Sequence, residues 1–361
     1  MLDAVGANQA LLSIKRTDMR ALIDIGHPAH VHYFRNFIRL FEEAGNEVLV
    51  TARKKEMSHE LLDLYKIPYI SRGTGSNGFI GKLLYLPKGN SILLKKALKF
   101  KPDVFLSFSS PYAAQVSSLL RKPHIAFDDT EHAKLGRWMY RPFTDKVLSP
   151  KCYNGPISKK QKLFNGYMEL LYLHPKYFTP REEVKSLLGL KKNDKYTILR
   201  FVSWEANHDV GHKGISLEMK REMVQQLSKH TRVFISSEAS LPQDLEPYRF
   251  NISPDWMHDA LGHAELFFGE SATMASEAAM LGTPGIYLDN VGRGYTDELE
   301  TFGLVYNFTE SEKDQREALN KALKILKEKE RKDFQAAHEK MMNSKIDVTS
   351  YLLQEVYALV Q

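Results

Sequence analysis

Residues 266–288 read LFFGESATMASEAAMLGTPGIYL, and this stretch contains a complete strand–helix–strand unit. The apolar run Leu266–Gly269 predicts a buried strand, and the small and apolar residues of Met274–Leu281 predict a helix. A Gly-Thr-Pro turn ends that helix, and Gly285–Leu288 predicts a second strand. A strand, a helix and a strand in this order form a parallel pair with a right-handed crossover, so the stretch predicts an α/β fold.

The same alternation extends through both halves of the chain. In the first half, apolar runs predict a helix over Val31–Ala44 and the strands Ala21–Ile25, Glu47–Thr51, Val104–Phe108, His124–Phe127 and Lys146–Ser149. In the second half, they predict helices over Ile215–His230 and Pro254–His263, and the strands Tyr196–Val202, Arg232–Ser236 and Leu304–Phe308. Two Rossmann-like domains in tandem follow from this pattern.

A chain of 361 residues is too long for one ordinary core, and two prolines near residue 177 mark the break between the domains. We therefore expect a mobile extension over residues 1–19, an N-terminal Rossmann-like domain over 20–173 and a linker over 174–181. A C-terminal Rossmann-like domain follows over 182–332. Residues 333–361 are almost all helix-forming, and we expect these helices to pack back on the N-terminal domain.

Composition excludes several classes of protein. Hydrophobic residues make up 43% of the chain and charged residues 26%, which is ordinary globular usage. Cys152 is the one cysteine, so the chain forms no internal disulfide and no cysteine-rich zinc site. Because the sequence has neither a spanning apolar stretch nor the order of charges of a secretory signal, we expect a cytoplasmic protein.

Positive charge is concentrated between Leu64 and Pro102. This window has no Asp or Glu, and it interleaves apolar residues with the cations Lys66, Arg72, Lys82, Lys88, Lys95, Lys96, Lys99 and Lys101. Such a patch favours an anionic partner, either a phosphate-bearing ligand or the anionic inner face of the plasma membrane. The alternative is a solvated basic helix over a packed core. No nucleic-acid-binding motif accompanies the patch, so dedicated nucleic-acid binding is not expected.

The loop Glu270–Thr273 follows a predicted strand and opens a helix. Ligands of open parallel sheets bind beyond the strand carboxyl ends, and a helix N-terminus favours an anion. Ser271 and Thr273 add hydroxyl groups, and Glu277, about one turn into the helix, can accept hydrogen bonds from a ribose diol. The alternative is an ordinary helix start, with Ser271 as its cap and Glu277 in an early turn.

The run from Ser271 to Pro284 resembles the donor-site motif of GT-B nucleotide-sugar enzymes. It is similar to the N-acetylglucosaminyltransferase that makes the peptidoglycan lipid precursor and to the non-hydrolysing UDP-N-acetylglucosamine 2-epimerases. The resemblance implies two Rossmann-like domains that face a central cleft, with the acceptor on 20–173 and the donor on 182–332. It also implies that Glu277 holds the ribose and that Ser271, Ala272 and Thr273 line the phosphates. Ala272 stands where the family has glycine.

Over roughly residues 20–350, the chain also resembles a family of prokaryotic proteins of unknown function in the same superfamily. That likeness implies a fold and brings no known reaction.

Three histidines follow the first predicted strand within the stretch Gly26–His32. In GT-B glycosyltransferases a Gly-His pair opens this helix and a Gly-x-Glu-Val run follows it, so His30 resembles the family histidine that deprotonates the acceptor. Ala29 replaces the preceding glycine. An unperturbed imidazole titrates near pH 6.5, which suits a base at neutral pH. His27 is the alternative. No carboxylate or cysteine lies at ligand spacing, so we expect no metal.

Two further loops follow predicted strands. Glu131, in the segment Asp128–His132, resembles an acidic residue of the epimerases, although a capped helix start accounts for the segment equally well. Trp204 and His208 lie in the loop after the first strand of the second domain. In GT-B enzymes that loop faces the diphosphate or the base.

These features predict a metal-independent glycosyltransferase of cell-surface polysaccharide or glycolipid synthesis. Its donor is a nucleoside-diphosphate sugar, with UDP as the expected nucleotide, and its acceptor is a glycan or a lipid-linked molecule. The nucleotide sugar is a substrate, and no cofactor is expected. Two alternatives stay open: a non-hydrolysing epimerase, which needs no acceptor, and a non-catalytic nucleotide-sugar-binding protein.

Overall fold

The computed structural model describes residues 18–75, 79–131, 134–202, 214–237 and 239–360. The chain divides into two compact units. The first comprises Met1–Tyr172 and Ile346–Gln361, and the second comprises Leu173–Lys345. Residues 1–17 of the expected extension lie outside the described residues. Met19, also assigned to that extension, is buried in the first unit, where its N–H donates to Asn46 Oδ1 at 3.1 Å.

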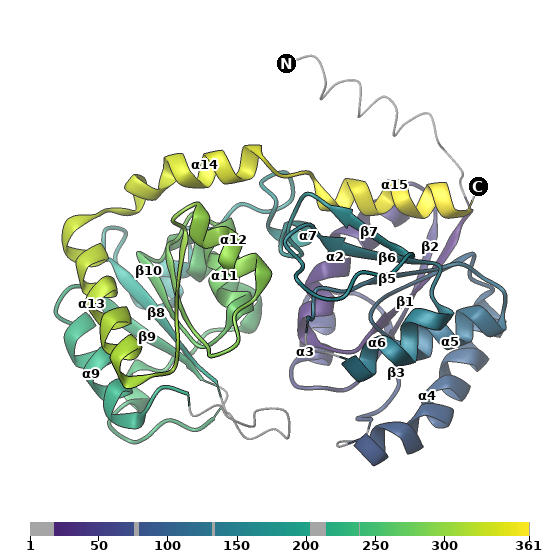
Figure 1. Ribbon diagram of the computed structural model, residues 1–361, viewed down its shortest axis with the longest axis horizontal. Coiled ribbons are helices and arrows are strands. Elements are labelled where there is room, and N and C mark those ends of the chain that lie inside the picture. Colours follow the sequence, from purple (N-terminus) through teal and green to yellow (C-terminus); the bar gives the residue numbers. More distant parts are fainter. Residues whose placement is uncertain (1–17, 76–78, 132–133, 203–213, 238, 361) are drawn as a thin grey trace. The chain divides into compact units, whose positions relative to one another are not determined.

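The first unit is built on a parallel sheet of seven strands in the order β3-β2-β1-β4-β5-β6-β7 (Figure 1). The strands are β1 (Arg20–Ile25), β2 (Glu47–Ala52), β3 (Tyr69–Ser71), β4 (Val104–Phe108), β5 (His124–Phe127), β6 (Lys146–Pro150) and β7 (Gln161–Phe164). The helices are α2 (Pro28–Glu43), α3 (Ser58–Leu64), α4 (Phe79–Phe100), α5 (Pro111–Leu119), α6 (Lys134–Tyr140), α7 (Leu170–Leu173, which ends in the second unit) and α15 (Val348–Val360).

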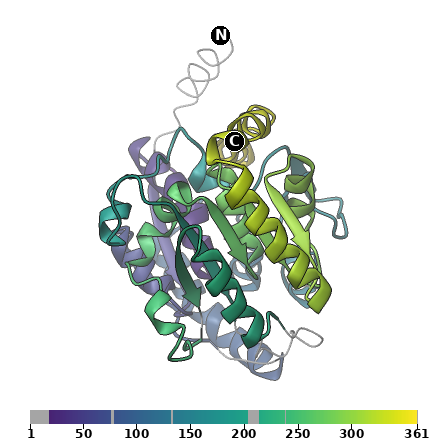
Figure 2. The same ribbon diagram turned by 90° about the vertical axis from the view of Figure 1, so that its left-hand side faces the viewer.

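The second unit holds a parallel sheet of five strands in the order β12-β11-β10-β8-β9. The strands are β8 (Tyr196–Phe201), β9 (Arg232–Ser237), β10 (Leu266–Gly269), β11 (Gly285–Leu288) and β12 (Val305–Phe308). The helices are α8 (Val184–Leu187), α9 (Leu217–Leu227), α10 (Met257–His263), α11 (Ala272–Met280), α12 (Gly294–Thr301), α13 (Glu312–Glu328) and α14 (Gln335–Asn343). Figure 2 looks onto the side of this unit where α9 and α13 pack together.

The α/β class is confirmed, and every predicted strand is present with ends within one residue of those expected. The predicted C-terminal helical segment divides between the two units. Helix α14 belongs to the second unit. Helix α15 packs on the first unit, where Glu355 pairs with Lys146 and Lys162 and the Thr349 hydroxyl donates to the Leu171 carbonyl.

Helix α2 shows why the local sequence folds as predicted. His27 is its N-cap and accepts from the Ala29 N–H, and Pro28 occupies the first turn, where a missing N–H costs nothing. The buried rings of Phe34, Phe37 and Phe41 form its apolar face. The helix therefore starts directly after β1, and this places His27 and His30 at the carboxyl end of that strand.

Helix α4 occupies most of the acid-free window. Its residues Leu93 and Ala97 are buried in a core cluster that also contains Leu22 and Phe105, so these apolar residues belong to the core and are not available to a membrane. Leu84, by contrast, is 75% exposed. The side chains of residues 79, 80, 82 and 83 lie outside the described part of the chain. Most of the basic window is therefore a helix that packs on the core through Leu93 and Ala97.

The carboxyl edge of each sheet contains a topological switch point, where the chain changes the direction in which it adds strands. In the first unit that point lies between β1 and β4, and in the second it lies between β8 and β10. The loop after β1 carries His27, and the loop after β10 carries Ser271. Ligands of open α/β sheets bind at such points, so the fold puts the predicted site residues where binding is expected.

A buried ion pair ties together the strands of the first unit. Asp24, on β1, has no exposed surface and accepts from the Nε and Nη2 of Arg72 at 2.6 and 3.0 Å. The hydroxyls of Thr51 and Ser110 donate to the same carboxylate at 2.7 and 2.5 Å. The four groups come from β1, β2, the end of β3 and the N-cap of α5, so one carboxylate joins four elements.

Asp24→Asn is expected to lower the free energy of unfolding by about 3–5 kcal/mol, because it leaves the Arg72 cation buried without its counterion. Glu47→Gln is the matched control, since Glu47 pairs with Arg20 at the surface and its side chain is 60% exposed. Its loss should cost at most about 1 kcal/mol. Urea denaturation followed by circular dichroism measures both. Equal stability of the two variants would show that Asp24 does not support the fold.

Candidate functional site

The candidate donor site of the second unit begins where β10 ends. Gly269 packs against β8 so closely that an added Cβ would lie 2.4 Å from the Arg200 carbonyl oxygen. Ser271 then caps α11, and its side-chain oxygen accepts from the Met274 N–H at 3.3 Å. The N–H groups of Ala272 and Thr273 belong to the first turn, where a helix offers donors without partners inside the helix. This end of α11 is a favourable place for an anion.

The Glu277 side chain is 7% exposed and is held by a second helix. Its Oε1 lies 2.9 Å from Nε2 of His258, a buried residue of α10. Because a carboxylate only accepts, His258 is the donor in this pair. Glu277 lies five residues after Ala272, on the helix whose first turn offers these N–H groups. Sequence analysis predicted Glu277 and missed His258, which lies 19 residues away on another element.

Glu270 organises the loop that was expected to face the diphosphate. Its buried carboxylate accepts from the Ile215 N–H at 2.6 Å and from the Val202 N–H at 2.9 Å. These two residues flank the segment 203–213, and the candidates Trp204 and His208 in that segment lie outside the described residues. Glu270 therefore fixes the backbone of Val202 and Ile215 beside the start of α11.

In the first unit, His27 and His30 lie together at the carboxyl end of β1, with their ring centroids 5.8 Å apart. The His30 ring also contacts Phe108, at the end of β4, with a centroid distance of 4.7 Å. Strands β1 and β4 flank the switch point of this sheet. The structure thus brings the two histidine candidates to the place where a ligand of the first unit is expected.

The hydrogen bonds of the two rings assign their tautomers. Nδ1 of His30 accepts from the Gly26 N–H at 3.2 Å, and Nδ1 of His27 accepts from the Ala29 N–H at 3.2 Å. A neutral imidazole whose Nδ1 accepts carries its proton on Nε2. Each ring therefore presents an N–H donor at Nε2.

Both rings favour the neutral state. Burial, followed by the charges of His27 and Lys55, lowers the pKa of His30 well below its ordinary value. Burial and Lys55 lower the pKa of His27 to about 4, against a smaller opposing effect of Glu56. The His27 side chain is 43% exposed, so water screens part of this effect, and the lowering is more secure for His30.

The segment predicted around Glu131 contains a different organised acid. Asp128 is buried, and its Oδ2 accepts from the hydroxyl of Tyr140 at 2.5 Å and from Nη2 of Arg141 at 3.3 Å. The Glu131 backbone carbonyl accepts from Arg137 at 3.0 Å. Burial, together with the Asp128 charge, raises the pKa of Tyr140 above its ordinary value. The structure thus fixes Asp128 in a network that sequence analysis did not single out.

The described residues contain neither a candidate metal site nor a candidate membrane-spanning helix. No group of three or more His, Cys, Asp or Glu in that part of the chain could hold a metal ion. No helix within the same residues is long and apolar enough to cross a membrane.

Comparison with known proteins places this geometry in a family. Residues 19–359 match the family described as "Protein of unknown function (DUF354)". The chain belongs to this family. A relative of this chain, an uncharacterized protein of Methanocaldococcus jannaschii, is 26% identical to it over 277 residues, which are 73% of this chain and 80% of that protein. The predicted likeness to a family of unknown function is therefore confirmed.

Solved structures show the fold of this DUF354 chain. The UDP-GlcNAc 2-epimerase from Neisseria meningitidis, bound to UDP-GlcNAc, is similar with a TM-score of 0.68 and 14% identity over 94% of this chain and 99% of that one. The spinosyn forosaminyltransferase SpnP is similar with a TM-score of 0.65 and 12% identity over 95% and 100% of the two chains. The fold is GT-B, as predicted.

The pKa of His30 is expected to lie well below 6.5 in the folded protein, whereas the same residue in the urea-unfolded chain titrates near pH 6.5. Because its folded pKa is the lower one, the native protein binds fewer protons than the unfolded chain below about pH 6.5. The contribution of His30 to the free energy of unfolding is therefore complete above about pH 6.5 and is lost as the pH falls towards the folded pKa. NMR of ring resonances, assigned with His30→Gln, measures the titration. A folded-state midpoint near 6.5 would contradict the neutral assignment.

Proposed function

We propose that this protein is a glycosyltransferase that moves a sugar from a nucleoside-diphosphate sugar, with UDP as the nucleotide, to a glycan or lipid-linked acceptor. One observation carries the proposal: α11 begins at the switch point of the second sheet and carries Glu277, whose carboxylate is fixed by His258. The first favours a diphosphate and the second favours a ribose diol. The Neisseria protein of the same fold, bound to UDP-GlcNAc, supports the choice of nucleotide.

The donor half of the reaction follows from the start of α11. As the bond between the sugar C1 and the diphosphate oxygen breaks, negative charge develops on the departing diphosphate. The N–H groups of Ala272 and Thr273 and the positive end of the helix would stabilise that charge without reorganisation. Ser271 accepts from the Met274 N–H, so its hydroxyl proton is available for donation to a phosphate oxygen. This reaction needs no metal and no cofactor.

The acceptor half is assigned to the first unit, with His30 as the residue that touches the acceptor. Sequence analysis cast His30 as a general base. The hydrogen bond from Gly26 to its Nδ1 favours instead a neutral ring that donates a hydrogen bond from Nε2 to an acceptor or sugar oxygen, and the hydroxyl proton of the acceptor then passes to the departing diphosphate. A neutral imidazole with a lowered pKa suits such a donor, because it polarises an oxygen without adding a full charge. His27, with the same tautomer, is the alternative.

A non-hydrolysing epimerase is the second candidate. It is favoured by the fold likeness to the Neisseria epimerase and by the acidic segment after β5, which contains Asp128 and the predicted Glu131. An epimerase requires acid–base groups at the sugar and no acceptor. The two candidates share the donor site, so they differ only in what happens to the sugar once it is bound.

Glu277→Gln is expected to weaken UDP binding about 10- to 100-fold and to leave the fold intact. A charge-assisted hydrogen bond contributes about 1.5–3 kcal/mol, and an amide cannot accept at both positions of the carboxylate. Isothermal titration calorimetry with UDP measures the effect. Glu312→Gln, a surface change of the same charge on α13, is the matched control. Unchanged affinity in Glu277→Gln would remove Glu277 from the donor site.

His30→Ala is expected to lower UDP release from a sugar donor about 10²- to 10⁴-fold and to leave UDP affinity unchanged, as expected for loss of a group that acts on the reacting atoms. His30→Gln keeps an N–H donor near the Nε2 position and should retain more activity than His30→Ala. Equal loss in both variants would contradict the donor role and favour a base.

The assay compares UDP-GlcNAc alone with UDP-GlcNAc plus a glycolipid extract, and NMR of the anomeric signals follows the sugar. UDP release that requires the extract identifies a transferase. Conversion of the nucleotide sugar in the absence of extract identifies an epimerase. UDP binding with no turnover in either mixture identifies a non-catalytic binding protein and overturns the proposed activity.

A further inference from the structure

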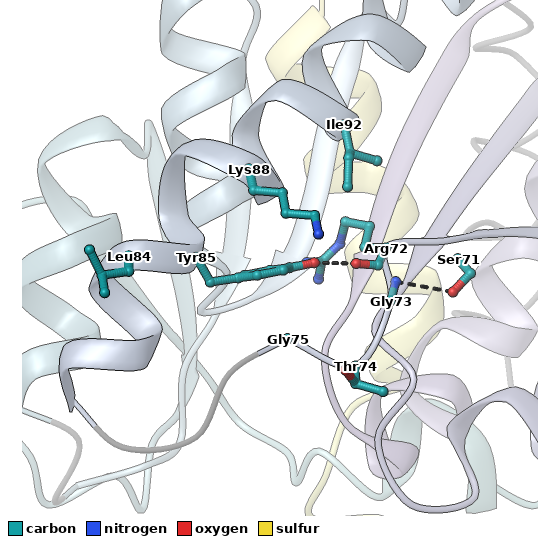
Figure 3. Close-up of a pocket in the computed structure, with 9 residues that line it drawn as sticks. All are labelled: Ser71, Arg72, Gly73, Thr74, Gly75, Leu84, Tyr85, Lys88 and Ile92. Carbon is teal, nitrogen blue, oxygen red and sulfur yellow. Dashed lines mark hydrogen bonds between the residues drawn. The ribbon is translucent and has the colours of Figure 1, made fainter.

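A cavity of about 510 Å³ lies in the first unit, at the carboxyl end of β3 (Figure 3). Neither His27 nor His30 lines it. One wall is the loop from Ser71 to Gly75, and the other is the face of α4 that carries Tyr85 and Lys88. None of its nine lining residues is acidic, and two of them, Arg72 and Lys88, are cations. The cavity therefore attracts anions more than other ligands.

Arg72 is held rigidly in this wall. Its Nε and Nη2 donate hydrogen bonds to the Asp24 carboxylate, and the guanidinium lies 4.5 Å from the centre of the Tyr112 ring. Its Nη1 is buried and has no hydrogen-bond partner among the described residues. A buried donor without a partner is costly in a protein interior. An oxyanion that displaced the covering side chains would provide the missing acceptor.

Lys88 supplies the second charge. Figure 3 shows its side chain reaching from α4 towards the Arg72 guanidinium, with the Tyr85 hydroxyl beside them. The Tyr85 hydroxyl donates to the Arg72 carbonyl, which ties α4 to the loop. The Asp24 carboxylate neutralises Arg72, so Lys88 contributes charge in excess. A flexible ammonium facing a fixed guanidinium suits a ligand oxygen placed between them.

Two glycines allow the backbone of this loop to approach neighbouring groups closely. Gly73 and Gly75 both have positive φ values, 76° and 74°, which favour glycine. A Cβ on Gly75 would lie 2.6 Å from Nε of Arg53, and that nitrogen donates to the Thr74 carbonyl at 2.7 Å. Arg53 thus adds a third cation beside the loop. Counting Asp24, the group carries a net charge of +2.

We propose that this cavity binds a phosphate group of the acceptor, between Lys88 and Arg72. The assignment rests on the proposed transferase function and extends it by naming the anionic group that the acceptor carries. Leu84 and Ile92 also line the cavity, so it suits a phosphate attached to a partly apolar body. Strand β3 lies two strands from β1 in the same sheet, so the cavity and His30 share one carboxyl edge.

The test uses phenyl phosphate as the soluble probe, because it joins a phosphate to an apolar ring. Calorimetric titration should show binding to the wild-type chain that Lys88→Gln weakens about tenfold, as expected for loss of a charge-assisted contact. Lys95→Gln is the matched control: it removes the same charge from the exposed surface of the same helix and does not line the cavity. Its affinity should equal that of the wild type.

Vesicles of phosphatidylcholine, with and without phosphatidic acid, identify the source of the phosphate. Binding that requires phosphatidic acid, that Lys88→Gln reduces and that Lys95→Gln keeps assigns a lipid phosphate. Binding of phenyl phosphate without binding of either vesicle assigns a soluble phosphorylated acceptor. Equal affinity of wild type and Lys88→Gln, or equal weakening by Lys88→Gln and Lys95→Gln, overturns the cavity as a site and leaves only a diffuse basic surface.

UDP titration of the same preparations separates this inference from the proposed function. UDP binding that Glu277→Gln weakens and Lys88→Gln leaves unchanged, together with no effect of Lys88→Gln on phenyl phosphate, overturns the cavity alone. Phenyl phosphate binding that depends on Lys88, in a protein that does not bind UDP, overturns the transferase proposal while the cavity stands as an anion site.

Discussion

The carboxylate of Asp24 is the constraint on which the first unit depends. It lies at the carboxyl end of β1 and accepts from Arg72, Thr51 and Ser110, so strands and a helix that are distant in sequence meet at one buried charge. A buried carboxylate is tolerated only when it is paired and fully hydrogen-bonded, and here four donors satisfy it. Two features follow: the loop after β3 has a fixed position, and the Arg72 guanidinium is held with its Nη1 group unpaired among the described residues.

The second unit uses buried carboxylates in the same way. Glu270 accepts from the backbone N–H groups at both ends of a loop, and Glu277 accepts from His258. In each unit the acidic residue lies at the carboxyl edge of a parallel sheet and fixes neighbouring groups. Free N–H donors and cations then face outward from the edge. Such an arrangement leaves the edge attractive to anions even though it contains carboxylates, because the carboxylates are already occupied.

Sequence was sufficient for the parts of this structure that depend on local pattern. Buried parallel strands are contiguous apolar runs, so all the predicted strands were found with ends correct to one residue. The helix predicted to start at Met274 starts two residues earlier, at Ala272, because Ser271 caps it. Strands β3 and β7 were not predicted, since each is short and the burial of their residues is mixed. The apolar residues of α4 could not be divided between core and surface, because Pro87 and the lysines obscure its period.

Long-range partners were beyond sequence reasoning. Arg72 lies 48 residues from Asp24, and His258 lies 19 residues from Glu277 on a different helix, so no spacing rule connects them. The tautomer of His30 was also inaccessible, because it depends on one backbone N–H four residues earlier. Residue types supplied the candidate side chains, and tertiary contacts decide how each is presented.

The neutral state of His30 is consistent with an edge that carries its positive charge elsewhere. Burial and the charges of His27 and Lys55 oppose protonation of the ring, while Arg53 and Lys88 supply cations nearer to β3. A charged imidazole would compete with those cations for an anionic ligand and would hold it away from the cavity. A neutral Nε2–H can contact an uncharged oxygen of the same ligand without that competition. In the function proposed for this protein, binding of charge near β3 is therefore separate from polarisation of an oxygen at β1.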